Sequence, residues 1–229
     1  MTENSLEQHY QNLYHSSINQ IKAKGCSVDP LLNDTQDDRY GITLLARPSE
    51  KVKNNIDEFL HSLKAIDSDQ YYYPATDLHV TIMSIISCYS GFSLEQINVP
   101  DYNGLIKTAL NGIPPFNIQF KGISASPSSI IICGYPEGNA MQMMRDQLRK
   151  HFKNSGLEES IDKRYTLKTA HATVVRFQKP LLHQKQYLNM LDTFTTHDFG
   201  SFTVNEPELV FNDWYQKADK VQQLATFNL

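Results

Sequence analysis

Few features of the sequence point to a secreted, membrane-spanning or metal-binding protein. The 229 residues include only three cysteines, and these form neither a Cys-x-x-Cys pair nor a spacing typical of zinc sites. No apolar run is long enough to cross a bilayer, and the first residues, MTENSLEQHY, lack the basic start and apolar core of a secretory signal. We therefore expect a cytoplasmic protein with reduced thiols and no membrane association.

Strong positive charge and nucleotide-binding glycine motifs are missing as well. The chain has 21 Lys and Arg residues against 25 Asp and Glu residues, which gives a net charge of −4. This balance provides no extended field for long nucleic acids, although a small anionic substrate needs only a local cluster of donors. Neither a P-loop nor a G-x-G-x-x-G run occurs, and no His and carboxylate spacing suggests a metal site. The sequence therefore indicates no cofactor and no metal.

The apolar pattern predicts a mixed α and β domain that follows an N-terminal helix. Residues 5–24 place their apolar side chains on one helical stripe, and residues 27–39 are acidic and polar, as in a loop. We assign residues 1–39 to this helix and acidic loop, and residues 40–229 to a single bilobal domain. In that domain we expect helices at 49–63, 103–110, 139–152 and 184–194, and strands at 40–46, 78–86, 116–124, 129–133, 169–177, 201–204, 208–212 and 221–227.

Within this domain the order strand, proline, helix and His-containing strand occurs twice, at residues 40–86 and again at 129–177. After each His-containing strand we expect a helix and then a strand that opens with a phenylalanine, Phe116 or Phe202. A duplicated unit is the economical explanation of this order.

The two repeated strands both carry a His-x-Thr motif, LHVTI at residues 78–82 and AHATV at residues 170–174. Side chains two apart on a strand share a face, so His79 points with Thr81 and His171 points with Thr173. If the two units pack about a pseudo-two-fold axis, these four groups converge on one groove. In-line displacement at phosphorus needs one group to accept a proton from the attacking oxygen and another to donate one to the leaving oxygen. The threonine hydroxyls can hold the non-bridging oxygens.

A single His-x-Thr motif is weak, because a lone histidine on a strand is usually a core residue bonded to a nearby carbonyl. A third match, His15-Ser16-Ser17, falls on the predicted N-terminal helix, where residues two apart face in different directions. The position of the other two at matching points of a repeat favours a functional pair.

The pair HVT and HAT in duplicated strand–helix–strand units resembles the 2H phosphoesterase superfamily, which includes RNA 2′-5′ ligase-like proteins and cyclic nucleotide phosphodiesterases. The resemblance covers about residues 40–227. It implies a bilobal α+β fold with antiparallel sheets lining a central groove, no obligatory metal, and action on 2′,3′-cyclic or 2′-5′-linked phosphates. It also implies that His79 and His171 are catalytic and that Thr81 and Thr173 bind the substrate phosphate.

Three further residues are candidates for substrate contacts. Arg176 extends the second motif to HATVVR, as a basic residue often does in that superfamily, while Ser84 stands at the equivalent place in the first copy. Strand parity puts Arg176 on the face opposite His171, so it reaches the phosphate only if the strand twists or bulges. Tyr73 and Tyr165 precede the two motifs and could stack on a base, although tyrosines that anchor loops in a core are more common.

We therefore expect a monomeric, metal-independent hydrolase that opens a 2′,3′-cyclic phosphate or a 2′-5′ phosphodiester on a nucleotide or a short RNA end. An RNA 2′-5′ ligase, which runs the reverse reaction, is an alternative, although the net negative charge disfavours a long RNA substrate. A catalytically idle nucleotide-binding module is a second alternative. Intact histidines in both copies argue against it, because binding alone does not need two proton-transfer groups.

Overall fold

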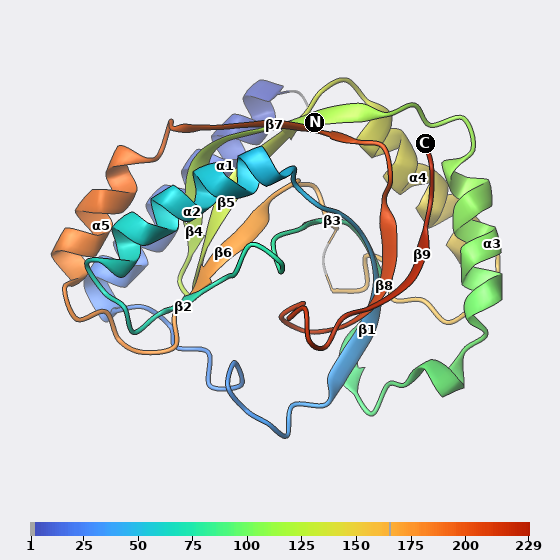
Figure 1. Ribbon diagram of the computed structural model, residues 1–229, viewed down its shortest axis with the longest axis horizontal. Helices are drawn as coiled ribbons and strands as arrows, with labels where there is room; N and C mark the ends of the chain where they lie inside the picture. The colour runs from blue at the N-terminus through green and yellow to red at the C-terminus, as the bar shows by residue number, and fades with distance from the viewer. Residues whose placement is uncertain (1–2, 165) are drawn as a thin grey trace.

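The computed structural model describes residues 3–164 and 166–229 and has the predicted α+β architecture. Two antiparallel sheets form the centre, and helices flank them on both sides (Figure 1). The helices are α1 (Glu3–Lys24), α2 (Glu50–Lys64), α3 (Val99–Leu110), α4 (Ala140–Lys153) and α5 (Gln184–Thr193), with a 3-10 turn η1 (Leu94–Gln96). The strands are β1 (Arg39–Ala46), β2 (Tyr71–Tyr72), β3 (Val80–Ser90), β4 (Phe116–Ser126), β5 (Ser129–Pro136), β6 (Ala172–Arg176), β7 (Asp198–Val204), β8 (Glu208–Asp213) and β9 (Gln222–Thr226).

The strand order places the two motif strands at matching positions in different sheets. The four-stranded sheet has the order β3-β1-β8-β9, and the five-stranded sheet has the order β2-β6-β5-β4-β7. The motif strands β3 and β6 each pair with the first strand of their own repeat, β1 and β5. The strand with Phe202 does not mirror the strand with Phe116, because β4 and β7 pair with each other. In the four-stranded sheet β8 lies beside β1, in the place that corresponds to β4 beside β5 in the five-stranded sheet.

The helices interlock the two sheets into one core. α2 follows β1 of the four-stranded sheet but packs against β7 of the other sheet and against α5. α4 follows β5 of the five-stranded sheet but packs against β3 and α3. Figure 1 shows the two helix pairs at opposite ends of the molecule. On α2 the buried side chains recur at the spacing of one helical face, which explains why this segment forms an amphipathic helix: Val52, Ile56, Phe59, Leu60 and Leu63.

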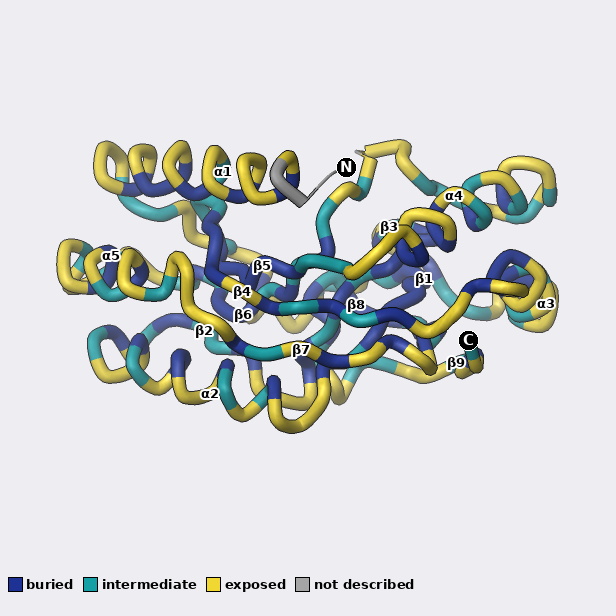
Figure 2. The backbone as a smooth tube through the Cα atoms, turned by 90° about the horizontal axis from the view of Figure 1, so that it is seen from above, coloured by how far each residue is buried: buried dark blue, intermediate teal, exposed yellow. Residues whose placement is uncertain are grey.

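The N-terminal helix α1 covers the face of the five-stranded sheet that lies opposite α2 (Figure 2). Leu6 and Tyr10 of α1 form a small buried cluster with Ile131 and Cys133 of β5. Ile131 is the cross-strand partner of Thr173 in β6, and directly opposed residues in a sheet share a face. The helix therefore lies on the same face of the sheet as the second His-x-Thr motif.

Among the helices formed by residues 3–164 and 166–229, none has both the length and the apolar character needed to cross a bilayer.

Candidate active site

The structure brings the two His-x-Thr motifs together around one cavity of about 200 Å³. His79, Thr81, His171, Thr173 and Arg176 all line it. His79 and His171 immediately precede β3 and β6, and the two threonines and Arg176 lie within those strands. The segment between α4 and β6, the end of β8 and the loop after β8 supply most of the remaining wall. Other lining residues include Ser84, Ser87, Cys88, Ser160, Arg164, Asn212, Trp214, Tyr215 and Gln216.

Both imidazoles are held by the residue two places earlier in the chain. His79 Nδ1 lies 2.7 Å from the carbonyl oxygen of Asp77, and His171 Nδ1 lies 2.8 Å from the hydroxyl oxygen of Thr169. A carbonyl oxygen can only accept, so Nδ1 of His79 carries a hydrogen and donates it. In its neutral form His79 therefore keeps its lone pair on Nε2, which can accept a proton from a reactant. The threonine hydroxyl can donate or accept, so His171 can adopt either tautomer.

A β-bulge at the same point of each motif sets which later side chains enter the cavity. Between β5 and β6, Ile131 pairs with Thr173 while Ile130 pairs with Val175, so Val174 has no partner of its own. Between β1 and β3, Leu45 pairs with Thr81 while Leu44 pairs with Met83, which leaves Ile82 as the extra residue. A bulge inserts one residue and so reverses the alternation of faces beyond it. The side chain three residues after each threonine consequently returns to the cavity side.

Arg176 reaches the cavity because of this bulge, as does Ser84 in the first motif. Arg176 Nε donates to the hydroxyl of Tyr73 at 2.9 Å, and its Nη1 lies 3.6 Å from Asp29 Oδ2. Its guanidinium carbon also lies 5.2 Å from the ring centroid of Tyr215. The acidic loop after α1 thus provides a carboxylate beside a cation of the candidate site.

The structure describes one of the two tyrosines proposed as base-stacking residues. Tyr73 lines the cavity but is only 3% exposed, and its hydroxyl accepts the hydrogen bond from Arg176 and so helps to orient that arginine. Tyr165 lies outside the described residues. Another aromatic ring at the cavity, Trp214, has the guanidinium carbons of Arg39 and Arg164 at 4.9 and 5.2 Å from its centroid. These distances are within the range of cation–π interactions.

Sequence analysis missed Arg145 of α4, which links the two motif strands. It is 3% exposed and donates from Nε to the carbonyl oxygen of Ile82 at 2.9 Å, and from Nη2 to those of Thr81 at 3.2 Å and Thr169 at 2.7 Å. Burial lowers the pKa of Arg145 to about 10, so it remains a cation at neutral pH. The available signal was its spacing, because Arg145 falls on the buried stripe of α4 with Met141 and Leu148.

The environment of both imidazoles disfavours their charged form. Burial lowers the pKa of His79 to about 4, helped by the positive charges of Arg47 and Arg176 and opposed by the hydrogen bond to Asp77. Burial likewise lowers the pKa of His171 to about 4, with further lowering by His79, Arg145 and Arg176. A histidine titrates at about 6.5 without such effects. Both imidazoles are therefore neutral at pH 7 in this arrangement.

Groups able to compensate phosphate charge line the cavity as cations and hydroxyls. Arg164 and Arg176 provide positive charge, and Thr81 and Thr173 provide hydroxyl donors. Within the part of the chain that the structure describes, no group of three or more His, Cys, Asp or Glu side chains is placed to hold a metal ion.

Comparison with protein families identifies the family of this chain. The family model described as the AKAP7 2′5′ RNA ligase-like domain matches residues 44–224. A search among curated proteins found no match.

Solved structures share the fold at low sequence identity. TT0787 of Thermus thermophilus has a TM-score of 0.51 at 16% identity, covering 83% of this chain and 97% of that one. E. coli LigT complexed with 3′-AMP has a TM-score of 0.52 at 13% identity, covering 84% and 98%. ATU0111, a conserved protein of unknown function from Agrobacterium tumefaciens, has a TM-score of 0.55 at 14% identity, covering 93% and 97%. The likeness to these structures establishes the fold, and the match to the family model over most of the sequence establishes that this chain belongs to the AKAP7 2′5′ RNA ligase-like domain family of the 2H phosphoesterase superfamily.

Proposed function

We propose that this protein hydrolyses a 2′,3′-cyclic phosphate or a 2′-5′ phosphodiester on a nucleotide or RNA end, with His79 and His171 as its acid–base pair and no metal. The observation that carries the proposal is the shared cavity, in which both imidazoles, both motif threonines and Arg176 meet. A site built only for binding needs donors for the phosphate, but it does not need two imidazoles that are each fixed through Nδ1.

The proton balance of the reaction uses one imidazole on each side of phosphorus. One neutral histidine accepts a proton from the attacking water, whose oxygen bonds to phosphorus. The bond from phosphorus to the leaving ribose oxygen breaks, and the other histidine, charged at that moment, donates its proton to that oxygen. The product is a phosphomonoester next to a free hydroxyl, and the two imidazoles have exchanged protonation states.

Arg176 and the two threonines bind the non-bridging oxygens in this mechanism. Tyr73 and Asp29 fix the guanidinium of Arg176, so little side-chain freedom is lost when the phosphate arrives. E. coli LigT, which has this fold, has been crystallised with 3′-AMP, and a nucleotide is therefore the natural first ligand to test.

The test is the rate of ring opening of the four 2′,3′-cyclic nucleotides, measured by chromatography with and without EDTA. We expect EDTA to have no effect, and we expect His79→Ala and His171→Ala each to lower the rate by about 10²–10⁴-fold. Thr81→Ala and Thr173→Ala should lower it less, because each removes one phosphate contact. His61→Ala is the matched control, since His61 is an exposed histidine on α2.

Three results would overturn parts of this proposal. Full activity in both histidine variants would remove the acid–base pair. Activity that EDTA abolishes and added metal restores would place the reaction in a metal-assisted class. Joining of a 2′,3′-cyclic end to a 5′-hydroxyl RNA end, without hydrolysis, would make the protein a ligase.

A further inference from the structure

The hydroxyl of Tyr10, on the N-terminal helix α1, is hydrogen-bonded to the residue that precedes His171 in the chain. The Tyr10 hydroxyl accepts a hydrogen bond from the backbone N–H of Ala170 at 3.3 Å and donates one to the carbonyl oxygen of Gly134 at 3.3 Å. Ala170 immediately precedes His171. A residue of α1, which the family model does not include, therefore contacts the backbone that carries a candidate catalytic side chain.

This hydroxyl takes the place of a ladder hydrogen bond between β5 and β6. The last pair in that ladder is Ile132 with Ala172, and the same register continued by two residues sets Gly134 opposite Ala170. In an antiparallel ladder, opposed residues can bond directly from N–H to carbonyl oxygen. Here the Ala170 N–H reaches the Gly134 oxygen through the Tyr10 hydroxyl, and β6 begins only at Ala172. Residues 169–171 thus do not continue the direct ladder of β6 with β5.

Residues 169–171 are also held by Arg145 and by the hydrogen bond between Thr169 and His171, so the position of this segment determines that of the imidazole. Arg145 binds the carbonyl oxygen of Thr169 at 2.7 Å, and the Thr169 hydroxyl is bonded to His171 Nδ1. Gly134 allows the carbonyl oxygen of Ala170 to come close to β5, because a Cβ at position 134 would lie 1.8 Å from that oxygen. A shift of Ala170 would consequently move both the backbone of His171 and its Nδ1 partner.

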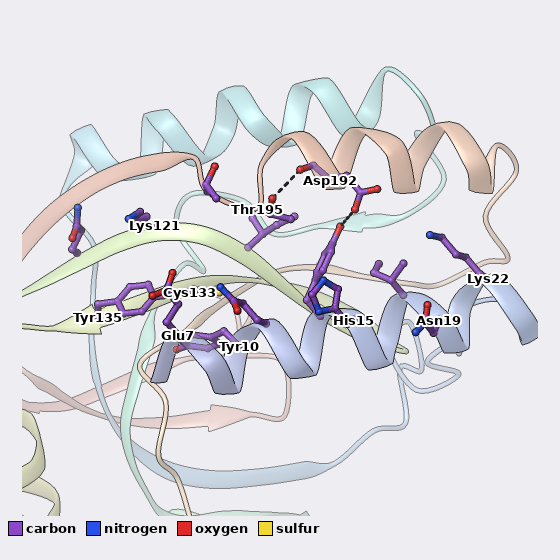
Figure 3. Close-up of a pocket in the computed structure, with 16 residues that line it drawn as sticks. Glu7, Tyr10, His15, Asn19, Lys22, Lys121, Cys133, Tyr135, Asp192 and Thr195 are labelled. Carbon is purple, nitrogen blue, oxygen red and sulfur yellow. Dashed lines mark hydrogen bonds between the residues drawn. The ribbon is translucent and has the colours of Figure 1, made fainter. Parts of the chain in front are cut away.

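Tyr10 itself is well anchored. It is 2% exposed, its own carbonyl oxygen accepts from the Ser124 hydroxyl at 2.9 Å, and its ring packs edge-on against Tyr135 at 5.7 Å between centroids. Figure 3 shows Tyr10 on α1 and Tyr135 on the strand beside the helix. Burial raises the pKa of the Tyr10 hydroxyl far above its usual value, so it stays protonated and remains a donor in any assay near neutrality.

We propose that Tyr10 is a positioning residue for His171, so that α1 completes the geometry of the active site. The kinetic part of this proposal rests on the proposed function. Tyr10 touches no substrate atom in this scheme, and it acts only through the Ala170 peptide.

Tyr10→Phe and Tyr14→Phe form a matched pair that tests the proposal. Both remove one hydroxyl from the buried face of α1, and the Tyr14 hydroxyl donates to Asp192 Oδ1 at 2.7 Å, a bond drawn as a dashed line in Figure 3. We expect Tyr10→Phe to lower kcat for the best cyclic nucleotide by about 10–100-fold with KM changed less than about twofold, because small misplacement of a reacting group mainly affects the chemical step. Tyr14→Phe should keep kcat within about twofold of the parent, even if its thermal unfolding midpoint falls as far as that of Tyr10→Phe.

A second readout needs no substrate. The ring protons of His79 and His171 can be titrated by NMR, with His79→Asn and His171→Asn used for assignment. We expect Tyr10→Phe to move the titration midpoint of His171 and leave that of His79 unchanged, while Tyr14→Phe moves neither. Ser124→Ala removes the hydrogen bond to the backbone of Tyr10 but keeps the Tyr10 hydroxyl. It should move the titration midpoint of His171 in the same direction by a smaller amount, and it replaces Tyr10→Phe as the test if that variant does not fold.

The two readouts separate this proposal from the proposed function. If neither a 2′,3′-cyclic phosphate nor a 2′-5′ phosphodiester is turned over, the proposed function fails, and the His171 titration still decides the positioning role. An unchanged His171 titration in Tyr10→Phe, or an equal change in Tyr14→Phe, would show that the helix acts only on stability and would overturn the proposal.

Discussion

Binding of an oxyanion at the candidate site should draw a proton from solution. Both histidines have a pKa of about 4 in this arrangement, so both are neutral at pH 7. Acid–base catalysis needs one of them charged. An anion between the imidazoles favours the charged form, since an opposite charge within hydrogen-bonding distance raises the pKa of a histidine by about 1–3 units. We therefore expect the negative charge of the substrate to raise the pKa of the histidine that acts as the acid, so that this histidine becomes protonated in the complex.

The size of the effect follows from these pKa values. If the anion raises the pKa of one histidine from about 4 to about 6.5, the protonated fraction of that histidine in the complex is about 0.25 at pH 7 and about 0.9 at pH 5.5. Affinity then increases as the pH falls, because protons bind the complex more tightly than the free protein. From pH 7 to pH 5 the association constant should rise about 20-fold, and it should level off below pH 4.

Sulfate is the appropriate probe because it stays a dianion across this range. Isothermal titration in two buffers of different ionisation enthalpy gives both the affinity and the number of protons taken up. We expect an uptake of close to one proton per sulfate at pH 5.5, and little uptake in a His79→Gln/His171→Gln double variant. An affinity that does not change between pH 7 and pH 5, or equal proton uptake in the double variant, would refute this reasoning.

Three further predictions concern the framework of the site. Arg145→Met should lower the free energy of unfolding by at least about 3 kcal/mol in urea titration, because three carbonyl oxygens, one buried and two partly buried, lose a charged donor. A loss below about 1 kcal/mol would contradict this role. Gly134→Ala should destabilise the fold by about 1–3 kcal/mol in urea titration and reduce activity, since its Cβ would clash with the carbonyl oxygen of Ala170. Gly104→Ala is the control, because Gly104 lies on an open helix surface, and it should stabilise the fold by about 0.5–1 kcal/mol in the same assay. The free energy of unfolding should also decrease as the pH is lowered from 6.5 to 4.5, because the histidines bind protons there in the unfolded chain and not in the native pair. The double histidine variant should show a smaller decrease over the same pH range.

The sequence was sufficient to find the motif strands and the pairing of each histidine with its threonine. Alternation over two residues is a local property of a strand, and all three positions of each His-x-Thr motif precede the extra residue of the bulge. Parity failed for Arg176 because a bulge inserts one residue and leaves no gap in the sequence. A signal was nonetheless present. In β3 the polar residues Thr81, Ser84 and Ser87 recur at every third position with an apolar pair between them, a period of three that an unbroken strand does not produce.

The choice of sheet for the later strands could not be predicted. The strands at Phe116 and Phe202 alternate in similar ways, and alternation shows which side chains are buried without showing which neighbour covers them. The pairing of β4 with β7, and of β8 with β1, depends on long-range contacts between elements far apart in the chain. The low pKa of the histidines could not be predicted for the same reason, because it comes mainly from burial, which depends on the packing of distant elements.

The N-terminal helix shows how a correctly predicted element can conceal a specific contact. Its apolar stripe predicts an amphipathic helix, and Tyr10 lies on that stripe with Leu6 and Ile18. A tyrosine differs from the aliphatic residues beside it, because a buried hydroxyl has to find a hydrogen-bond partner. On a helix that covers a sheet, the nearest unpaired partners are backbone groups where a ladder ends, and β6 ends its ladder next to His171. A buried tyrosine on a helix that packs over a strand end is therefore a position at which packing and site geometry can be coupled.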